Sequence, residues 1–272
     1  MSLIKFSKMV ASGNDFVVIE EDFLPSGLRL KDAVKKICSR KFGVGADGVL
    51  VIGKSCKADI RMRIFNADAT EAEMCGNGAR CAAFYAAGRL SPNRVWNEIS
   101  IETIAGIIDS RVVEDSVKAK LTYPKELKLG IGLKVNGRNI KTDFINTGVP
   151  HAVLFVEGLE KINVFDLGRR IRQHKYFSPR GTNVNFVEVI GKNSIKVRTF
   201  ERGVEDETLA CGTGSVASAL IFALKTGLTG EVKVHTRSLE VLSVYFRRQQ
   251  DIFGDVWLEG KADIVFIGEL EI

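Results

Sequence analysis

The chain carries one unusual motif twice, and the two copies lie half a chain length apart. Residues 74–81 read Met-Cys-Gly-Asn-Gly-Ala-Arg-Cys, and residues 210–215 read Ala-Cys-Gly-Thr-Gly-Ser. Cys75 and Cys211 are 136 residues apart (211 − 75), which is half of the 272 residues. A repeat of this length predicts two homologous half-domains with one cysteine each, and not a solenoid of short repeats.

The similarity extends to both sides of the two cysteines. An apolar segment with Arg63 precedes the first cysteine, as one with Arg198 precedes the second, and an acidic stretch follows each arginine. After the cysteines, small residues continue to a glycine, over residues 79–88 in one copy and 215–227 in the other. Each copy therefore predicts a strand, a turn and a helix that begins at its Cys-Gly-x-Gly sequence.

A cysteine at the start of a helix has a chemical consequence. The first N–H groups of a helix have no partner within it, and together with the helix dipole they stabilise anions. The thiolate is therefore favoured, and the pKa of such a cysteine falls below its ordinary value of about 8.5. Flanking glycines let backbone N–H groups approach a bound carboxylate closely. Each copy is thus predicted to be an anion site with a thiol beside it.

The other three cysteines, Cys38, Cys56 and Cys81, lack this context. We expect them to be packing residues, because a free cysteine often behaves as a small buried hydrophobe. An odd total of five cysteines without regular spacing indicates a reducing compartment rather than a disulfide scaffold. Three histidines without a Cys-x-x-Cys pair predict no metal site.

Composition restricts the possible partners. A chain with 45% hydrophobic and 26% charged residues is typical of a globular protein of one or two domains. It has no apolar run long enough to span a membrane and no signal-peptide core at its start. The densest basic stretch, residues 169–176, is better explained by a solvated helix face than by a nucleic-acid site, since no nucleic-acid motif accompanies it. We expect a cytoplasmic protein without membrane or nucleic-acid partners.

Hydrophobic periodicity predicts more strands than helices. The expected strands are residues 16–20, 48–52, 60–65, 99–103, 117–121, 152–156, 185–189, 195–200, 231–235 and 256–259. The expected helices are residues 30–39, 78–88, 165–174 and 214–225. This balance favours the α+β class, with each half-domain a curved, mostly antiparallel sheet or barrel around a central helix that begins at its cysteine. Alanines give both central helices small side chains, so that each helix can fit inside its curved sheet.

The boundary between the halves is expected near Tyr123, where the strand pattern gives way to a stretch containing Lys and Gly at residues 125–138. The N-terminal half-domain is then residues 1–124 and the C-terminal half-domain residues 125–259. The final strand, residues 260–272, could return to the first half. A pseudo-two-fold relation would place one active site in the cleft between the halves.

Several segments of the sequence resemble those of a known family. The chain is similar to diaminopimelate epimerases over nearly its whole length, in separate segments that occur in the same order. They are Ser12-Gly13-Asn14-Asp15-Phe16, Phe42 to Gly48, Phe65 to Asp68, Met74 to Gly78, Asn146 to His151, Gly181 to Phe186, and Glu201 to Gly203 followed by Ala210 to Gly214.

The resemblance implies an isomerase that needs no cofactor. Its substrate would be a diamino dicarboxylic acid, LL-2,6-diaminoheptanedioate, which is inverted at one α-carbon to the meso form in lysine biosynthesis. Inversion requires a base on one face of that carbon and an acid on the other, roles that the resemblance assigns to Cys75 and Cys211. Residues matching His151 and Glu201 support catalysis beside the α-amino group. The resemblance also implies a homodimer.

Further residues are expected to bind the substrate. Backbone N–H groups at Gly76, Asn77, Gly212 and Thr213 would meet the reacting carboxylate. At the distal end the family positions correspond to Asn14, Asn66, Asn183 and Arg202, with Glu201 beside the amino group. Arg202 would hold a carboxylate by two parallel hydrogen bonds. The chain departs from the usual family pattern at Gly48 and Val149, which bears on these distal contacts.

Three other interpretations remain open from sequence. A proline or hydroxyproline racemase uses the same pair of cysteines, although its first motif usually has His where this chain has Asn77. A thiol redox switch would join Cys75 and Cys211 by a disulfide. A binding protein could keep the fold without turnover.

Overall fold

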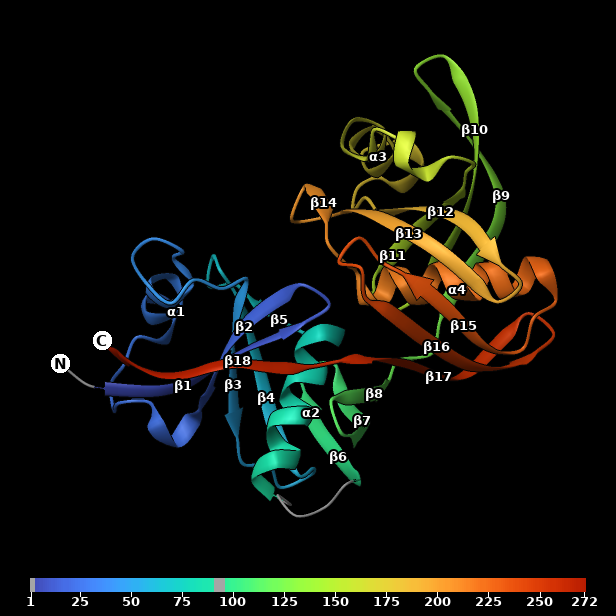
Figure 1. The fold of residues 1–272 in the computed structure, drawn as a ribbon. Coiled ribbons are helices and arrows are strands. Elements are labelled where there is room, and N and C mark those ends of the chain that lie inside the picture. The colour runs from blue at the N-terminus through green and yellow to red at the C-terminus, as the bar shows by residue number, and fades with distance from the viewer. Residues whose placement is uncertain (1–2, 91–95) are drawn as a thin grey trace. The chain divides into compact units, whose positions relative to one another are not determined.

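The chain forms two compact units. The computed structural model describes residues 3–90 and 96–272. Unit 1 consists of Met1–Ala119 with Gly260–Ile272, and unit 2 of Lys120–Glu259 (Figure 1). The boundary expected at residues 124 and 125 therefore lies just inside unit 2, and the last residues of the chain belong to unit 1.

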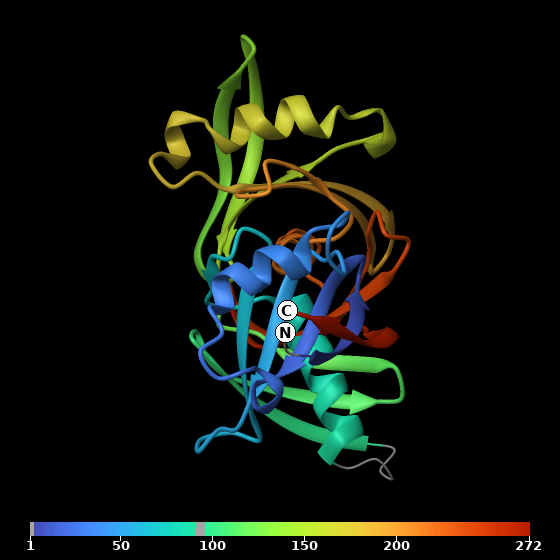
Figure 2. The same ribbon diagram turned by 90° about the vertical axis from the view of Figure 1, so that its left-hand side faces the viewer.

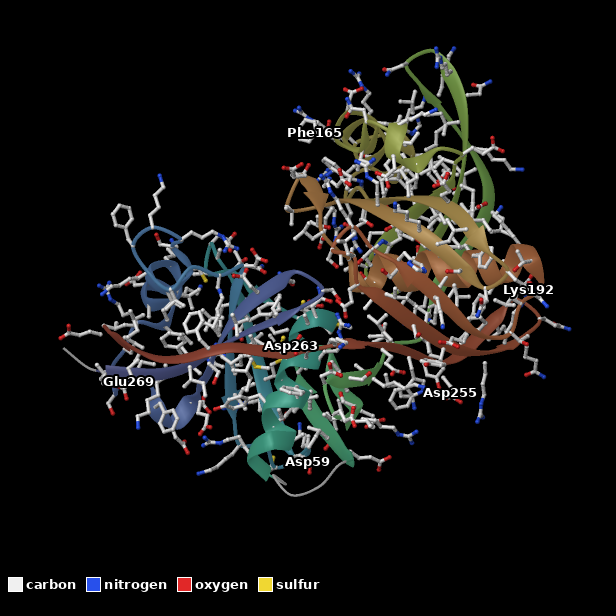
Figure 3. The ribbon with its side chains drawn as sticks, in the orientation of Figure 1. Asp59, Phe165, Lys192, Asp255, Asp263 and Glu269 are labelled. Atoms are coloured by element: carbon white, nitrogen blue, oxygen red, sulfur yellow. The ribbon has the colours of Figure 1, made fainter. Side chains whose placement is uncertain are left out.

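Unit 1 is built from strands and two long helices. Its elements in chain order are β1 (Leu3–Ala11), β2 (Asn14–Glu20), η1 (Glu21–Phe23), α1 (Leu30–Cys38), β3 (Gly48–Gly53), β4 (Ile60–Asn66), β5 (Glu71–Ala72), α2 (Gly76–Leu90), β6 (Trp96–Thr103), β7 (Gly106–Val113), β8 (Ser116–Lys120) and the returning β18 (Asp263–Glu271). Asp263 and Glu269, labelled in Figure 3, lie along β18, which pairs antiparallel with β1.

Two crossover connections organise unit 1. Strands β1 and β2 form an antiparallel hairpin, and α1 then connects β2 to the parallel β3. Strand β4 returns antiparallel to β3, and α2 connects β4 to the parallel β6. Strands β6, β7 and β8 continue antiparallel. A helix is the usual way to join parallel neighbours.

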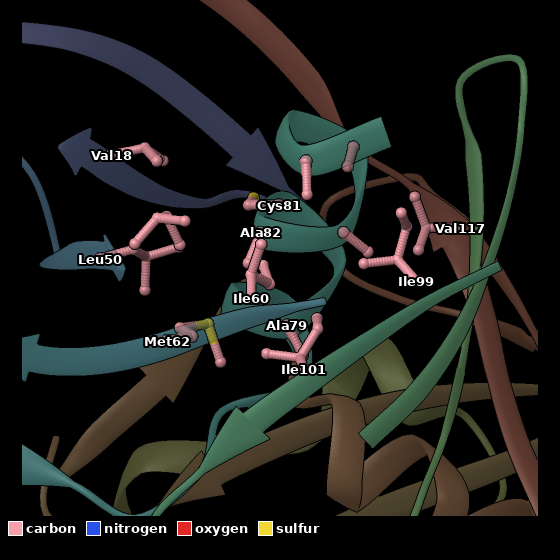
Figure 4. Close-up of a cluster of buried hydrophobic side chains, with 14 of the residues drawn as sticks. Val18, Leu50, Ile60, Met62, Ala79, Cys81, Ala82, Ile99, Ile101 and Val117 are labelled. Atoms are coloured by element: carbon pink, nitrogen blue, oxygen red, sulfur yellow. The ribbon is translucent and has the colours of Figure 1, made fainter. Parts of the chain in front are cut away.

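Alternation along the strands gives each helix its own apolar face. On β2, Phe16 and Val18 pack in the cluster around α2, whereas Val17 and Ile19 pack in the cluster around α1. Figure 2 shows α1 lying across the strands of unit 1 on the near side. Figure 4 shows the opposite face, where Leu50 and other side chains of the strands surround α2. The period of two in the side-chain directions thus builds two cores from one sheet.

Unit 2 repeats this order. Its elements are β9 (Lys125–Val135), β10 (Arg138–Asn146), β11 (Pro150–Phe155), η2 (Leu159–Lys161), α3 (Val164–Arg172), η3 (Lys175–Phe177), β12 (Asn183–Gly191), β13 (Ser194–Glu201), β14 (Asp206–Thr208), α4 (Gly212–Thr226), β15 (Gly230–His235), β16 (Val241–Gln249) and β17 (Ile252–Lys261). Again α3 joins the parallel pair β11 and β12, and α4 joins the parallel pair β13 and β15.

The returning C-terminal strand also has a counterpart in unit 2. Strand β9 pairs antiparallel with β10, as β18 pairs antiparallel with β1. In unit 2 this strand directly precedes its partner, whereas in unit 1 the same place is taken by the end of the chain. The return of β18 therefore completes the repeat.

The expected α+β class is confirmed, with a strand-rich fold and a helix that begins directly after each motif cysteine. Helix α4 ends at Gly227, which adopts the left-handed conformation at φ 75° that favours glycine as a C-cap. The matching expectation for the first half is wrong, since α2 continues past Gly88 to Leu90. Helix α4 is buried from Gly214 to Ala223.

The expectation of a strand break at residues 125–138 is also wrong. Strand β9 covers Lys125–Val135, and its second half alternates between buried and exposed residues. Ile131, Leu133 and Val135 are buried, with glycine and lysine on the exposed side between them. Because the intervening glycine and lysine have unfavourable strand propensity, the alternation of buried and exposed residues was not recognised in the sequence.

Candidate functional site

Cys75 directly precedes α2 in unit 1, as its motif predicts. The backbone N–H of Gly78 donates to Cys75 Sγ across 3.4 Å. This is the geometry in which the unpaired N–H groups of a first helical turn stabilise a sulfur anion. Gly78 has only modest room for a side chain, because a Cβ there would lie 3.2 Å from Leu50 Cδ2.

Two asparagines lie beside Cys75. The amide nitrogen of Asn14 donates to Asp47 Oδ2 across 2.7 Å, and since a carboxylate only accepts, this contact fixes which way the amide points. Asn14 Oδ1 is then directed at Asn77 Nδ2, 3.5 Å away, and at Cys75 Sγ, 3.9 Å away. Unit 1 thus places a hydrogen-bond acceptor next to its catalytic candidate.

A buried arginine supports this arrangement, although sequence reasoning did not select it. Arg80 is fully buried in α2, and its Nη2 donates to Ser12 Oγ across 2.6 Å and to Asn77 Oδ1 across 2.7 Å. The signal in the sequence was a charged residue among the small side chains of the first turns of the helix. Its guanidinium orients Asn77 toward Asn14.

A charged cluster holds Asp47 in place. Arg40 Nη2 donates to Asp47 Oδ1 and to Asp15 Oδ1, each across 2.8 Å, and Lys8 Nζ donates to the other oxygen of Asp15. Burial raises the pKa of Asp15, but the hydrogen bonds from Arg40 and Lys8 outweigh it and lower that pKa to about 2. Asp15 is therefore charged at neutral pH.

Asn66 ends β4 and is exposed. Its amide nitrogen donates to Thr70 Oγ1 across 2.9 Å, within the turn that follows the strand. The next residue, Ala67, donates its N–H to the carbonyl of Asp47 across 3.1 Å. The turn after β4 thus lies beside the charged cluster that orients Asn14.

Cys211 is the N-cap residue of α4 in unit 2. Its side chain is buried, and Sγ lies 3.5 Å from Thr213 Oγ1. A Cβ at Gly214 would lie 2.3 Å from Asn185 Oδ1, so only glycine lets the helix approach this asparagine. Asn185 was not selected from the sequence, where an Asn-Val-Asn strand gives no indication of the helix it faces.

His151 lies in β11 and is fully buried. Its Nε2 is 3.0 Å from Thr213 Oγ1, and its Nδ1 is 3.1 Å from Asn185 Nδ2. Burial, and after it the positive charge of Arg202, lower the pKa of His151 to about 3. The imidazole is therefore neutral at physiological pH.

Arg202, Asn183 and Glu201 lie together at one end of the sheet in unit 2. Asn183 Oδ1 accepts from the backbone N–H of Arg202 across 2.7 Å, and Arg202 Nη1 donates to the carbonyl of Arg180 across 3.3 Å. Glu201 is the last residue of β13. Unit 2 thus places a guanidinium, an amide and a carboxylate at the end of the sheet where β11 begins, and His151 is the second residue of that strand.

The remaining cysteines differ from the expectation at one position. Cys38 and Cys81 are buried, as expected for packing residues, but Cys56 is exposed, so the packing interpretation is wrong for it. Cys56 follows Ser55 in a polar turn, where an apolar core is not available. Burial raises the pKa of Cys38 to about 11, which keeps that thiol protonated.

The basic stretch at residues 169–176 spans the end of α3 and the turn after it. Arg170 Nε donates to Asp166 Oδ1 across 3.1 Å, and Arg172 Nε donates to Glu205 Oε1 across 2.8 Å. These positive charges are thus paired with carboxylates. Phe165, labelled in Figure 3, is exposed on α3 near this stretch. Within residues 3–90 and 96–272, no helix has the length and apolar character needed to cross a membrane.

Comparison with known sequences points to one family. The family profile described as Diaminopimelate epimerase matches residues 6–125 and 144–253. A diaminopimelate epimerase of Aquifex aeolicus (strain VF5) is 46% identical over 280 residues, with 98% of each chain covered. One from Hydrogenobaculum sp. (strain Y04AAS1) is 40% identical, with 97% of each chain covered, and one from Methanocella arvoryzae is 40% identical, with 100% of this chain and 98% of that protein covered.

Solved structures with low sequence identity share the fold. A PhzF-family phenazine biosynthesis protein of Bacillus anthracis has a TM-score of 0.77 at 20% identity, with all of both chains covered. A hydroxyproline epimerase of Agrobacterium vitis, solved with bound trans-4-OH-L-proline, also has a TM-score of 0.77 at 14% identity, covering 98% of this chain and 92% of that one. These structures show that the fold recurs in proteins of low sequence identity.

Proposed function

The chain belongs to the diaminopimelate epimerase family and is an isomerase that acts on a small molecule, and from this premise we propose that it interconverts LL-2,6-diaminoheptanedioate and its meso form. The reaction would require no cofactor and would serve lysine biosynthesis in the cytoplasm. The observation that carries the proposal is the pair of matched thiols, Cys75 and Cys211, each at the start of a buried helix.

The proposed chemistry is a two-base proton transfer. One cysteine, as thiolate, removes the α-proton, while the other, as thiol, delivers a proton to the opposite face, so that the α-carbon is inverted. The roles of Cys75 and Cys211 exchange in the reverse direction. Near-attack geometry would require the α-carbon to lie within about 3–3.5 Å of both sulfurs.

The helix starts would stabilise the charge that develops on the substrate. When the α-proton leaves, negative charge spreads onto the α-carboxylate, where backbone N–H groups at Gly76 and Asn77 and at Gly212 and Thr213 would meet it. Glu201 would bind the α-ammonium group as a carboxylate partner. Because His151 is neutral, it adds no positive charge that would repel that ammonium.

Substrate selection would depend on the distal end of the molecule. Arg202 offers the planar guanidinium that binds a carboxylate with two parallel hydrogen bonds. Asn14, Asn66 and Asn183 would bind the distal polar groups, and a substrate that lacks them would leave these amides unpaired. A proline-type substrate has no such groups, which favours the diamino dicarboxylate over a racemase function.

The decisive experiment is incubation of reduced protein with LL-diaminopimelate in D₂O, followed by proton NMR and chiral analysis. Deuterium entering one α-position as meso product forms is the expected result. L-Proline serves as the parallel substrate, and exchange on proline alone would replace this proposal with a racemase. Absence of exchange on both, with Cys75 and Cys211 joined by a disulfide after oxidation, would favour the redox switch.

We also infer a homodimer, in line with the family resemblance. Strand β18 carries four consecutive exposed apolar residues, Ile264, Val265, Phe266 and Ile267, which a second copy could cover. Sedimentation equilibrium tests this, with Phe266→Lys as the variant expected to shift the protein to monomers. A wild-type protein that is monomeric at micromolar concentration would contradict the inference.

A further inference from the structure

A continuous chain of hydrogen bonds in unit 2 ends at the sulfur of Cys211. Thr199 Oγ1 donates to Asn185 Oδ1 across 2.9 Å, and Asn185 Nδ2 lies 3.1 Å from His151 Nδ1. His151 Nε2 lies 3.0 Å from Thr213 Oγ1, which in turn lies 3.5 Å from Cys211 Sγ. Thr199, Asn185 and His151 are buried, so water does not compete for these contacts.

One backbone carbonyl sets the direction of this chain. Asn185 Nδ2 donates to the carbonyl of Ala152 across 3.2 Å, and because that carbonyl only accepts, the amide nitrogen must point this way. Its second hydrogen then faces His151 Nδ1, so Nδ1 accepts and the imidazole proton lies on Nε2. That proton is donated to Thr213 Oγ1, which leaves the hydroxyl hydrogen of Thr213 for Cys211 Sγ.

Cys75 Sγ accepts from the helix N–H of Gly78 across 3.4 Å, and a carbonyl oxygen also faces it. Asn14 is held by Asp47 with its carbonyl oxygen toward Cys75 Sγ, 3.9 Å away. A carbonyl oxygen can accept from a thiol but repels a thiolate. Cys211 thus faces a side-chain hydroxyl donor, whereas the side chain that faces Cys75 is a carbonyl acceptor, in addition to the N–H of Gly78.

We propose that Thr199, Asn185, His151 and Thr213 form a directional relay that assigns the resting thiolate to Cys211 and the resting thiol to Cys75. Asn185 and Thr199 are positioning residues here, because they act on Cys211 only through His151 and Thr213. The consequence for turnover rests on the proposed two-base reaction. The substrate isomer whose α-proton faces Cys211 then meets an enzyme that is ready to react, and the thiol of Cys75 supplies the proton that the product needs.

The first test locates the thiolate by its ultraviolet absorption at neutral pH, with a Cys75→Ala, Cys211→Ala double variant as the baseline. The thiolate signal should persist in Cys75→Ala and disappear in Cys211→Ala. A signal that follows Cys75, or no thiolate signal in either single variant, overturns the proposal. Both measurements are made on the full-length reduced protein.

The second test removes the inner end of the relay. In the Cys75→Ala background, Thr199→Val and Asn185→Leu should lower the thiolate-to-thiol ratio of Cys211 roughly tenfold, because His151 and Thr213 are then no longer held to donate toward the sulfur and a hydrogen bond to a charged group is weakened. Thr142→Val is the matched control, because Thr142 is also buried in unit 2 but donates to backbone carbonyls outside the relay. An equal decrease of the thiolate-to-thiol ratio in the Thr142→Val control would show that the effect comes from general destabilisation, and it would contradict the relay. If Asn185→Leu fails to fold, Thr199→Val alone decides.

A spectroscopic measurement checks the tautomer independently. The chain has three histidines, so ¹⁵N-histidine labelling gives a spectrum in which His151 can be assigned from its absence in His151→Gln. We expect a neutral ring protonated at Nε2, and partial Nδ1 protonation in Asn185→Leu. Protonation at Nδ1 in the wild type would refute the relay. An active epimerase with its thiolate at Cys75 contradicts only the relay, whereas an inactive protein with its thiolate at Cys211 contradicts only the proposed function.

Discussion

The two units share one order of strands and helices but differ in what lies beneath their central helices. The pairing register identifies equivalent positions, since Phe16 opens one parallel ladder opposite Gly48 and His151 opens the other opposite Asn183. The next layer pairs Leu50 with Ile64 in unit 1 and Asn185 with Thr199 in unit 2. Three apolar side chains in one unit thus correspond to His151, Asn185 and Thr199 in the other.

Both units keep a Cys-Gly-x-Gly sequence and small residues at the start of the central helix, while the residues beneath the helix differ. In unit 1, Phe16, Leu50 and Ile64 pack in an apolar core against α2. In unit 2, the equivalent space holds polar groups whose buried atoms are joined by hydrogen bonds, as low-dielectric surroundings require. The scaffold accepts either interior, so one half could acquire a proton-directing relay while the other kept an apolar core.

A second pair of equivalent residues keeps its ion pair but is more buried in unit 2, where Arg237 also contacts the carboxylate. Arg63 donates twice to Glu71 in unit 1, and Arg198 donates twice to Glu207 in unit 2, with N to O distances between 2.7 and 3.0 Å. The side chains are 38% and 28% exposed in the first pair and 13% and 10% exposed in the second. The same ion pair therefore lies in two different dielectric surroundings.

The comparison first predicts that the two units are equally necessary for turnover. Cys75→Ala and Cys211→Ala should each lower epimerisation by roughly 10³-fold or more, because each removes one partner of a general acid–base pair. Steady-state assays on LL-diaminopimelate measure this loss, and circular dichroism controls for folding. Wild-type turnover in either variant would show that only one thiol participates.

The ion pairs of the two units should contribute unequally to the stability of the protein. Glu207→Gln should cost about 2 kcal/mol of unfolding free energy, since it leaves the buried Arg198 without its charged partner. Glu71→Gln should cost less than about 1 kcal/mol, because its pair is more exposed. Urea unfolding of the two variants measures the difference, and equal losses would mean that burial does not distinguish them.

The acid stability of the wild type follows from the same pairs. Burial raises the pKa of Glu207, but hydrogen bonds from Arg198 and Arg237 outweigh it, and the net direction is down from 4.5. A carboxyl with a lowered folded-state pKa stabilises the protein above its unfolded pKa and loses that contribution as pH falls through the folded value. Stability should therefore fall below about pH 4.5, and the Glu207→Gln variant should lose less over that range than the wild type.

Much of this organisation could be predicted from the sequence, because it depends on local pattern. The duplicated Cys-Gly-x-Gly sequences predicted both central helices and their starts. In each copy a run of small residues with a helical pattern follows the motif, and this local pattern is enough to indicate a helix. The relay could not be predicted in this way. Asn185 and Thr199 face each other only through strand pairing, and no local pattern reports which residue lies opposite. Arg80 was missed for a related reason, because its partner Ser12 lies far away in the sequence.

The end of strand β13 gives a third contrast between the units. Arg202 follows β13 in unit 2, where the equivalent position after β4 in unit 1 holds Ala67. Arg202→Lys should raise the KM for LL-diaminopimelate about tenfold with a smaller change in kcat, because an ammonium cannot reproduce a two-point carboxylate contact. Arg169→Lys, on the exposed face of α3, is the control. An unchanged KM would move the distal carboxylate site away from Arg202.

The smallest expected effect concerns how closely each central helix packs against the residues beneath it. Gly78 and Gly214 hold the same place in α2 and α4, and alanine at either gains up to about 1 kcal/mol of helix propensity. At Gly78 the new Cβ meets the flexible end of Leu50 at 3.2 Å, so the leucine can shift and the net change should be near zero. At Gly214 it would lie 2.3 Å from Asn185 Oδ1, and this atom is held by Thr199, so overpacking of about 1–3 kcal/mol exceeds the gain. Thermal unfolding of Gly78→Ala and Gly214→Ala measures the difference, and a Gly214→Ala protein as stable as the wild type would show that the relay beneath α4 yields as easily as the apolar core beneath α2.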